Sequence, residues 1–416
     1  MRNNYIILLV FGVMIHTYAQ KTKFPLDKGY KDKIIASLNS AINHTTKAML
    51  NQKGMARGNY HMISGQWQEY EAAWHTGQAI QGLLEAYKVT DNKMALDHAI
   101  KAGNWWISLQ FPKGHALEGY LFAKHGNTLG DLINTTTITD GTPGLFDLSD
   151  VTGDKKYADV ATSAGAWILD NLYIPKERLS YNIVDGETAK IWKNQSPHAQ
   201  HQGLPFTIKH VARPNVEGYL WKDIYTHTGK KRYKYAFLEV CDKLIDDQSD
   251  NGWWMDYEPN DPTTGKVHGR FNTWNAEALL EAYRLTKQQK YLEAAVKTAK
   301  ALAKVQGKSG VIWYSSYLDG NHDKRSPCGS AVSFAGILWL QLYELGITDF
   351  EKNIRLAINF TLKNQFSKDH KDPNLAGAYY EIRQRAKKDG TLELYYRDIA
   401  TSFGMRFLSN VYQNAF

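Results

Sequence analysis

Residues 279–303, LLEAYRLTKQQKYLEAAVKTAKALA, contain two segments with helical periodicity separated by a short turn at Thr286. In the second segment an apolar residue recurs at every fourth position, at Tyr291, Ala295 and Ala299. This is the pattern of an amphipathic helix that buries one face. The stretch therefore predicts a pair of antiparallel helices joined by a tight turn.

The same pattern occurs five times along the chain. Each copy has an apolar first segment, a turn that carries a threonine, and an amphipathic second segment. The copies follow one another at intervals of about 60 residues, which is typical of a repeating helical hairpin. The turns lie at Thr90, Thr152, Thr228, Thr286 and Thr348.

Two further helical segments, at residues 34–50 and 399–411, flank the five copies and complete six hairpins. The first helix of each pair tends to be apolar on all sides, as in residues 330–345, SAVSFAGILWLQLYEL, and such helices are buried. Buried inner helices surrounded by amphipathic outer ones predict an all-α (α/α)6 toroid. An open solenoid would need polar caps at its ends. We expect residues 20–416 to form one toroid domain.

Long connections link the predicted hairpins. Several alternate aromatic and polar residues, as in residues 119–126, 252–259 and 310–317, and this alternation predicts short β-hairpins. Long loops in a compact domain are usually functional. We therefore expect the connections to surround an active-site mouth where the inner helices begin.

The first nineteen residues have the pattern of a secretory signal peptide. Arg2 precedes an apolar run at residues 6–15, and residues 17–19, TYA, resemble a cleavage site. We therefore expect an exported protein, either periplasmic or secreted. Because no run reaches about 18 uninterrupted apolar residues, we also expect no membrane span. Cys241 and Cys328 either pair or stay as buried thiols, and two cysteines are too few to hold the fold together.

The formal net charge of +8 favours an anionic partner. The chain has no block of Lys and Arg of the kind that binds nucleic acid. Its 12 Trp and 25 Tyr offer flat faces that stack on sugar rings. We therefore expect an acidic oligosaccharide as the substrate and no nucleic acid.

Residues 198–221, HAQHQGLPFTIKHVARPNVEGYLW, concentrate titratable side chains at a predicted loop–helix junction. Pro205 and Pro214 indicate a loop with a helix that starts at Pro214. The spacing of the three histidines matches no standard metal site, so we expect no metal, and we expect no other cofactor. The site residues predicted here are His201, His210, Arg213, Glu217 and Tyr219.

The turns and the six hairpins resemble the six-hairpin glycosidase-like superfamily. Residues 69–87, EYEAAWHTGQAIQGLLEAY, are similar to the first inner helix of its unsaturated uronyl hydrolases, and residues 326–346 resemble a later inner helix. These hydrolases use an acidic residue at the start of an inner helix, and in the matching stretch, residues 135–154, that residue is Asp140. Their arginine-glycine signature is replaced by ARPNVEGYLW at residues 212–221. The His, Arg and Tyr side chains at the loop–helix junctions also resemble the sites of toroid uronate lyases and dehydratases.

Two reactions compete on these residues. Glycoside hydrolysis normally needs a pair of carboxylates, and no pair stands out among Asp140, Asp147, Glu217, Glu277 and Asp398. β-Elimination on a uronic acid needs a cation that neutralises the carboxylate, a base and an acid, roles that suit Arg, His and Tyr. Such residues recur before three successive inner helices, and others lie near the first. Predicted to bind substrate are Trp74, His75, His268, Arg270, Asn272, Trp274 and Tyr314.

The sequence therefore predicts an enzyme that acts on uronic-acid-containing oligosaccharides. It would form an unsaturated uronyl residue at the non-reducing end by β-elimination, as a lyase or a dehydratase. The alternatives are an unsaturated uronyl hydrolase that uses Asp140, a uronyl epimerase, and a glycan-binding protein without catalytic activity. The predicted catalytic residues are His201, His210, Tyr317 and Asp140.

Overall fold

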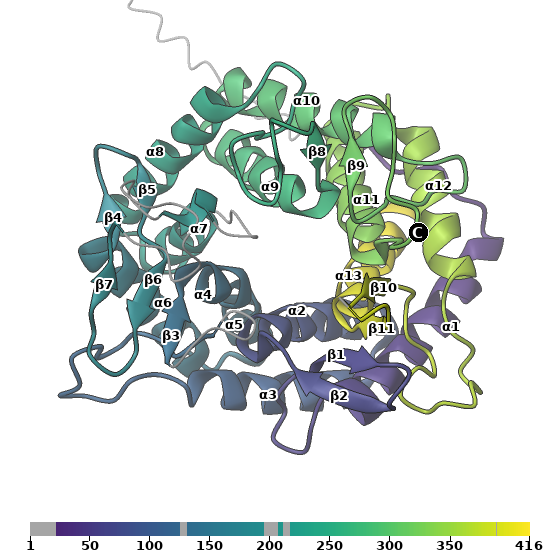
Figure 1. Ribbon diagram of the computed structural model, residues 1–416, viewed down its shortest axis with the longest axis horizontal. Helices are drawn as coiled ribbons and strands as arrows, with labels where there is room; N and C mark the ends of the chain where they lie inside the picture. The colour runs from purple at the N-terminus through teal and green to yellow at the C-terminus, as the bar shows by residue number, and fades with distance from the viewer. Residues whose placement is uncertain (1–21, 125–130, 195–206, 211–216, 388) are drawn as a thin grey trace, which may run out of the picture.

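The computed structural model describes residues 22–124, 131–194, 207–210, 217–387 and 389–416. Within these residues the helices form two concentric rings (Figure 1). The inner ring consists of α2 (Ala72–Thr90), α4 (Thr135–Gly141) followed by α5 (Pro143–Thr152), α7 (Glu217–Thr228), α9 (Gly269–Thr286), α11 (Gly329–Glu344) and α13 (Ile399–Ala415). The outer ring consists of α1 (Gly29–His44) with its π-helical end η1 (Thr45–Met49), α3 (Lys93–Ile107), α6 (Lys156–Asn171), α8 (Lys231–Asp247), α10 (Gln289–Val305) and α12 (Glu351–Lys363).

This arrangement confirms the predicted (α/α)6 toroid. α11 buries almost every side chain, as its all-round apolar sequence predicts. α10 buries one face, on which Tyr291, Ala295 and Ala299 lie. The predicted first helix of the second repeat is divided into α4 and α5 near Pro143, since a proline is tolerated only in the first turn of a helix.

Short strands occupy the connections between hairpins, but of the three segments predicted to form β-hairpins only residues 310–317 contain a strand, and the described residues of 119–126 and 252–259 contain none. Three small antiparallel sheets are formed by β3 (Leu132–Asn134), β6 (Ile183–Asp185) and β7 (Ile191–Trp192), by β4 (Tyr173–Ile174) and β5 (Leu179–Ser180), and by β8 (Lys266–Val267) and β9 (Ser316–Tyr317). A larger sheet has the order β10 (Ile382–Ala386), β11 (Leu392–Arg397), β1 (Gly58–His61) and β2 (Gln66–Glu69). A 3-10 turn, η2, spans Ile208–His210.

The larger sheet joins the two ends of the chain. β1 pairs with β11 in antiparallel register, with Tyr60 opposite Tyr396. On this face Tyr60 and Tyr396 are buried with Leu375, so the sheet has an apolar side that packs against the loop before β10. Because α13 also packs between α2 and α11, the end of the chain closes the ring beside the first inner helix (Figure 1).

Cys241 and Cys328 are both free and buried, so they form two thiols and no disulfide. Among the described helices none is both long enough and apolar enough to cross a bilayer. The predicted signal peptide, at residues 1–19, lies outside the described residues.

The inner helices α2 and α4 touch through their backbones. A Cβ atom added to Gly77 on α2 would collide with the carbonyl group and Cα of Gly141 on α4. Two glycines at this contact therefore allow an approach that any side chain would prevent.

We expect Gly77→Ala to lower the free energy of unfolding by about 1–3 kcal/mol, because backbone atoms have little room to move away from the added methyl group. The control is Gly29→Ala at the exposed start of α1, where the added Cβ would meet only the side chain of Asp27. Urea denaturation of both variants measures the difference. Equal stability of the two variants would contradict the predicted backbone contact.

A buried histidine connects α1 to the closing strand. His44 is 2% exposed, and its Nε2 lies 3.1 Å from the hydroxyl oxygen of Tyr396 on β11. Burial lowers the pKa of His44 to about 3, against a hydrogen bond from its ring to the Ala376 backbone that raises it. The folded protein therefore keeps this imidazole neutral at neutral pH.

Between pH values of about 6.5 and 3, the unfolded chain binds a proton at His44 that the folded protein does not bind. Stability is therefore lost as the pH falls through this window, with a contribution of up to about 1.4 kcal/mol per pH unit. We expect His44→Gln to reduce the slope of unfolding free energy against pH by this amount. Urea denaturation at a series of pH values tests it, and an unchanged slope would be inconsistent with a neutral buried His44.

Candidate active site

Two strands of the larger sheet run directly into two inner helices. β2 is followed by Tyr70, Glu71 and α2, and β11 ends at Arg397, which only Asp398 separates from α13. The backbone N–H of Gly58 on β1 donates to Asp398 Oδ2 over 3.0 Å, and the Asp398 N–H donates to the Gly58 carbonyl over 3.1 Å. These bonds hold the beginnings of α2 and α13 beside each other.

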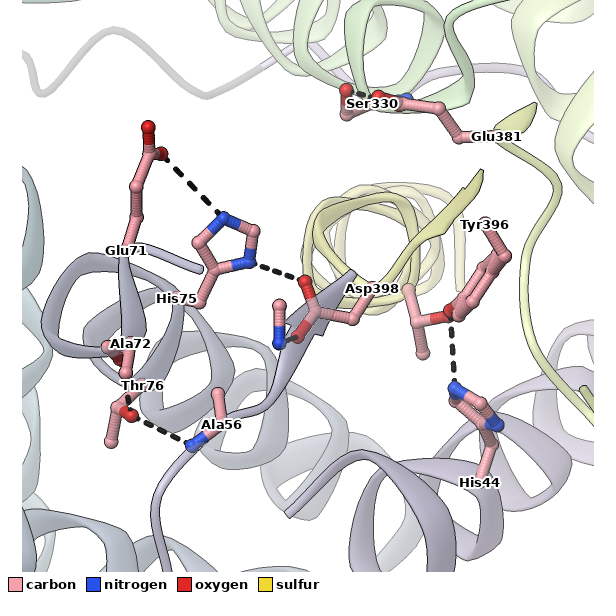
Figure 2. Close-up of polar contacts among 12 residues, drawn as sticks. His44, Ala56, Glu71, Ala72, His75, Thr76, Ser330, Glu381, Tyr396 and Asp398 are labelled. Atoms are coloured by element: carbon pink, nitrogen blue, oxygen red, sulfur yellow. Dashed lines mark hydrogen bonds and ion pairs between the residues drawn. The ribbon is translucent and has the colours of Figure 1, made fainter. Parts of the chain in front are cut away.

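His75 and Asp398 form a buried pair at this junction (Figure 2). Both side chains are fully buried, and His75 Nδ1 makes a short hydrogen bond to Asp398 Oδ1. Since a carboxylate only accepts, Nδ1 carries a proton, and in a neutral imidazole Nε2 then carries the lone pair. His75 Nε2 has no hydrogen-bond partner within the described part of the chain, and it lies 3.8 Å from Glu71 Oε2. An imidazole fixed in this way can take a proton at Nε2.

Glu71 adopts an unusual backbone conformation. Its φ of 52° and ψ of 38° lie in the left-handed region, which costs a residue with a side chain about 1–2 kcal/mol. At this residue the chain turns from the segment after β2 into α2. The Glu71 carboxylate then points toward His75 (Figure 2). Strain of this kind is concentrated at functional sites.

A basic cavity adjoins the His75–Asp398 pair. Successive side chains of a strand point to opposite faces, so the face of the larger sheet opposite the apolar one collects alternate residues of its strands. They surround a cavity of about 430 Å³. Its lining is Asn59, Gln68, Tyr70, Arg383, Arg385, Glu393, Tyr395 and Arg397. Two lining residues are chain neighbours of the groups around the pair, Tyr70 beside Glu71 and Arg397 beside Asp398.

The three arginines of this cavity have no acidic partner at ion-pair distance among the described residues. Arg383 instead lies over the ring of Tyr314, with 4.4 Å between the guanidinium carbon and the ring centre. Burial lowers the pKa of Arg383, and the charges of Arg397 and Arg385 lower it further. Unbalanced cations that repel one another attract an anion to the space between them.

His268 is neutral in this environment. It is fully buried, and its ring lies 4.2 Å from the ring of Tyr314. Burial holds the pKa of His268 well below its usual value, and the nearby charges of Arg270 and Arg383 act in the same direction. The side chains predicted at two successive junctions, His268 and Tyr314, thus contact each other at the edge of the basic cavity.

Arg270 belongs to a buried wall. It is 1% exposed, pairs with Glu381 at 3.5 Å and donates to Ser330 Oγ at 2.6 Å. Glu381 in turn accepts from the backbone N–H of Ser330 (Figure 2). The guanidinium also lies within 6 Å of the rings of Trp74 and Trp274, at 5.7 and 5.9 Å. The two tryptophans, whose ring centres are 6.0 Å apart, form an aromatic layer around it.

Asp140 and Tyr219 lie in a second, smaller chamber. Asp140 is 2% exposed, and its backbone carbonyl accepts from Gln78 Nε2 over 2.6 Å. Burial raises the pKa of Tyr219 well above its usual value and raises that of Glu277 as well. The chamber is lined by Gln78, Gln81, Thr139, Asp140, Pro143, Tyr219, Trp274, Glu277 and Arg406.

The other predicted site residues have different surroundings. Asn272 uses its side-chain amide within the protein, since it accepts from the Trp254 N–H at 3.1 Å and donates to the His268 carbonyl at 2.8 Å. His210 Nδ1 accepts from the Thr207 N–H at 3.1 Å. Tyr317 is a half-buried residue of β9. His201, Arg213 and the side chain of Glu217 lie outside the described residues.

Sequence reasoning missed most of the basic cavity and gave His75 only a substrate-binding role. It named Asp398 as a carboxylate without a partner. The signals were the acidic and aromatic residues before the first inner helix, EYE at residues 69–71, and YYRD at residues 395–398 before the last. The residues it missed are Tyr70, Glu71, Glu381, Arg383, Arg385 and Arg397.

No group of three or more His, Cys, Asp and Glu side chains within the described ranges has an arrangement that could hold a metal ion.

Comparison with known proteins places the chain among carbohydrate-active enzymes. Residues 19–249 match the family described as Beta-L-arabinofuranosidase, GH127 catalytic domain. A search of curated proteins gave no match.

The fold is similar to those of solved toroid enzymes. Cellobiose 2-epimerase from Bacillus thermoamylovorans is 12% identical with a TM-score of 0.70, over 92% of this chain and 99% of that one. Unsaturated glucuronyl hydrolase from Bacillus sp. GL1 is 12% identical with a TM-score of 0.63, over 91% and 96%. D-mannose isomerase is 12% identical with a TM-score of 0.65, over 93% and 97%. At these identities the similarity establishes the shared fold.

We expect Asp398→Asn to reverse the tautomer of His75. The carboxylate accepts from both Gly58 N–H and His75, and an amide has only one accepting oxygen. Because the backbone N–H cannot become an acceptor, the amide oxygen stays on Gly58 and the NH2 group faces His75 Nδ1. The proton of the ring then moves to Nε2.

Nitrogen NMR of ¹⁵N-histidine-labelled protein measures this change, and the spectrum of His75→Gln assigns the signal. The native protein is expected to carry the His75 proton on Nδ1 and Asp398→Asn on Nε2. The same tautomer in both proteins would rule out the proposed control by Asp398.

Proposed function

Because the chain belongs to the Beta-L-arabinofuranosidase, GH127 catalytic domain family and is thus a carbohydrate-active enzyme, we propose that it acts by β-elimination on an oligosaccharide with a uronic acid at its non-reducing end. The observation that supports this most is the buried His75, held by Asp398 with Nε2 available, beside three arginines without acidic partners. Elimination next to a carboxylate needs this combination of a base and cations.

The arginines act on the carboxylate of the uronic acid. The proton on C5 is weakly acidic while the neighbouring carboxylate keeps its negative charge. Arg397, 4% exposed, and Arg383 would bind this carboxylate and stabilise the charge that develops when C5 loses its proton. Their fixed positions on β10 and β11 mean that little reorganisation is needed during the reaction.

His75 Nε2 would take the proton from C5. The electrons of the C5–H bond form the C4=C5 double bond, and the C4–O bond breaks with its electrons on the leaving oxygen. Asp398 stabilises the imidazolium, as a buried carboxylate does for a catalytic histidine. The leaving oxygen takes a proton from the hydroxyl of Tyr70, whose ring centre is 6.5 Å from that of His75 and 5.6 Å from the Arg397 guanidinium.

The leaving group decides between the two forms of the reaction. If C4 carries the next sugar, the enzyme is a lyase and cleaves the chain. If C4 carries a hydroxyl group, water leaves and the enzyme is a dehydratase. Both leave an unsaturated uronyl residue. We also propose that the predicted signal peptide exports the protein, so that it meets its substrate outside the cytoplasm.

Hydrolysis is the second candidate, and the family match favours it. It needs two carboxylates on either side of the bond. Asp140 and Glu277 are the buried carboxylates that line the smaller chamber, while Glu71 lies beside His75 and Glu381 is engaged by Arg270 and Ser330. This candidate would use the smaller chamber and would leave Arg383 and Arg397 without a catalytic role.

Absorbance and mass distinguish the candidates. Incubation with saturated uronate oligosaccharides is expected to raise the ultraviolet absorbance of the conjugated double bond, and mass spectrometry then separates loss of water from chain cleavage. No rise with these compounds, together with a fall when unsaturated oligosaccharides are supplied or release of sugar from arabinofuranosides, would support hydrolysis instead.

We expect His75→Gln to lower kcat/KM for elimination by about 10²–10⁴-fold, because the base is lost. His227→Gln on α7, whose ring contacts Asp150, is the control and should leave the rate unchanged. If His75→Gln stays active and Asp140→Asn is inactive, the assignment of the base is wrong and hydrolysis through Asp140 is favoured.

A further inference from the structure

The basic cavity contains one arginine more than a single carboxylate requires. Arg397 and Arg383 lie at the end of the cavity next to His75. Arg385 lies farther along β10, toward the turn that joins β10 to β11. Its side chain points to the same face as that of Arg383, because the two residues are two positions apart on the strand.

The backbone positions of Arg385 and Arg397 lie at different levels of the sheet. Arg385 is paired in register with Glu393, which precedes Arg397 by four positions on β11. At about 3.3 Å per residue, these two levels of the sheet are about 13 Å apart. One carboxylate spans only a small part of this distance.

The acidic residue opposite Arg385 does not neutralise it. Glu393 pairs with Lys387 at 2.8 Å, and this bond to the Lys387 ammonium comes first among the causes that lower the pKa of Glu393. No carboxylate of the described residues lies within ion-pair distance of Arg385, which is exposed and lines the cavity. Nearby, Gln68 and Asn59 add polar groups that can bind oxygen atoms.

We propose that Arg385 is the centre of a second anion subsite, which binds an oxyanion on the sugar next to the reacting uronic acid. The inference rests on the proposed function, since Arg397 and Arg383 bind the reacting carboxylate there. The ligand chemistry is a carboxylate or a sulfate ester, because a guanidinium binds two oxygens of either group. The substrate class is then an oligosaccharide with anionic groups on two consecutive sugars.

Binding measurements by calorimetry test the subsite with three probes. Each probe has a uronic acid at the non-reducing end, and the second sugar is neutral, sulfated or a second uronic acid. The native protein is expected to bind at least one of the two doubly charged probes about 10-fold or more tightly than the neutral one. The preferred probe identifies the oxyanion.

Arg385→Gln should bring the three affinities to within about twofold of one another while binding of the neutral probe stays unchanged. Arg325→Gln is the matched control, since it removes the same charge from an exposed arginine that Asp323 already pairs with at 2.8 Å. This control should keep the preference. Equal affinities in the native protein, or a preference that survives Arg385→Gln, would overturn the proposal.

Elimination is followed by absorbance on the same probes. A preference that depends on Arg385 without any rise in absorbance supports the subsite and rejects the proposed reaction. A rise in absorbance with equal affinities supports the reaction and rejects the subsite. The two ideas can therefore fail separately.

Discussion

The hydrogen bonds of Asp398 determine how the ring closes and where its site lies. One carboxylate accepts from Gly58 on β1 and from His75 on α2, so it joins the last inner helix to the first strand and the first inner helix. These residues are 340 and 323 positions away from Asp398 in the sequence. A charge buried this completely is stable only when it is well paired. Closure of the ring and assembly of the His75 site are consequently the same event.

The sheet beside this carboxylate has two faces with different tasks. Its apolar face, with Tyr60 and Tyr396, packs on the protein, and the alternation of side chains places arginines on the other face. Strain in the backbone of Glu71 and repulsion around Arg383 both lower stability. The large apolar core of the toroid offsets this loss of stability. The result is a positively charged cavity next to His75, the proposed base. The family match establishes a carbohydrate-active enzyme, and this cavity is what favours an acidic sugar.

Much of the architecture could be predicted because it depends on local patterns. The period of Tyr291, Ala295 and Ala299 defines an outer helix whatever its neighbours are, and the all-apolar residues 330–345 define an inner one. The site was predicted less well. His75, His268 and Tyr314 were predicted as substrate-binding residues because they lie at the starts of inner helices or just before them. Asp398 and Arg397, at the opposite end of the chain from His75, gave no local sign of a shared site.

The sequence by itself determined the helical hairpins, their number and their inner and outer order, since periodicity and repeat length are properties of the chain. Only the tertiary structure decided which titratable groups meet. The loop at residues 198–221 is dense in histidines, yet the described site is built from His75, Asp398 and the arginines of β10 and β11. The physical reason is that ring closure brings together residues from both ends of the chain, and no short-range pattern records that contact.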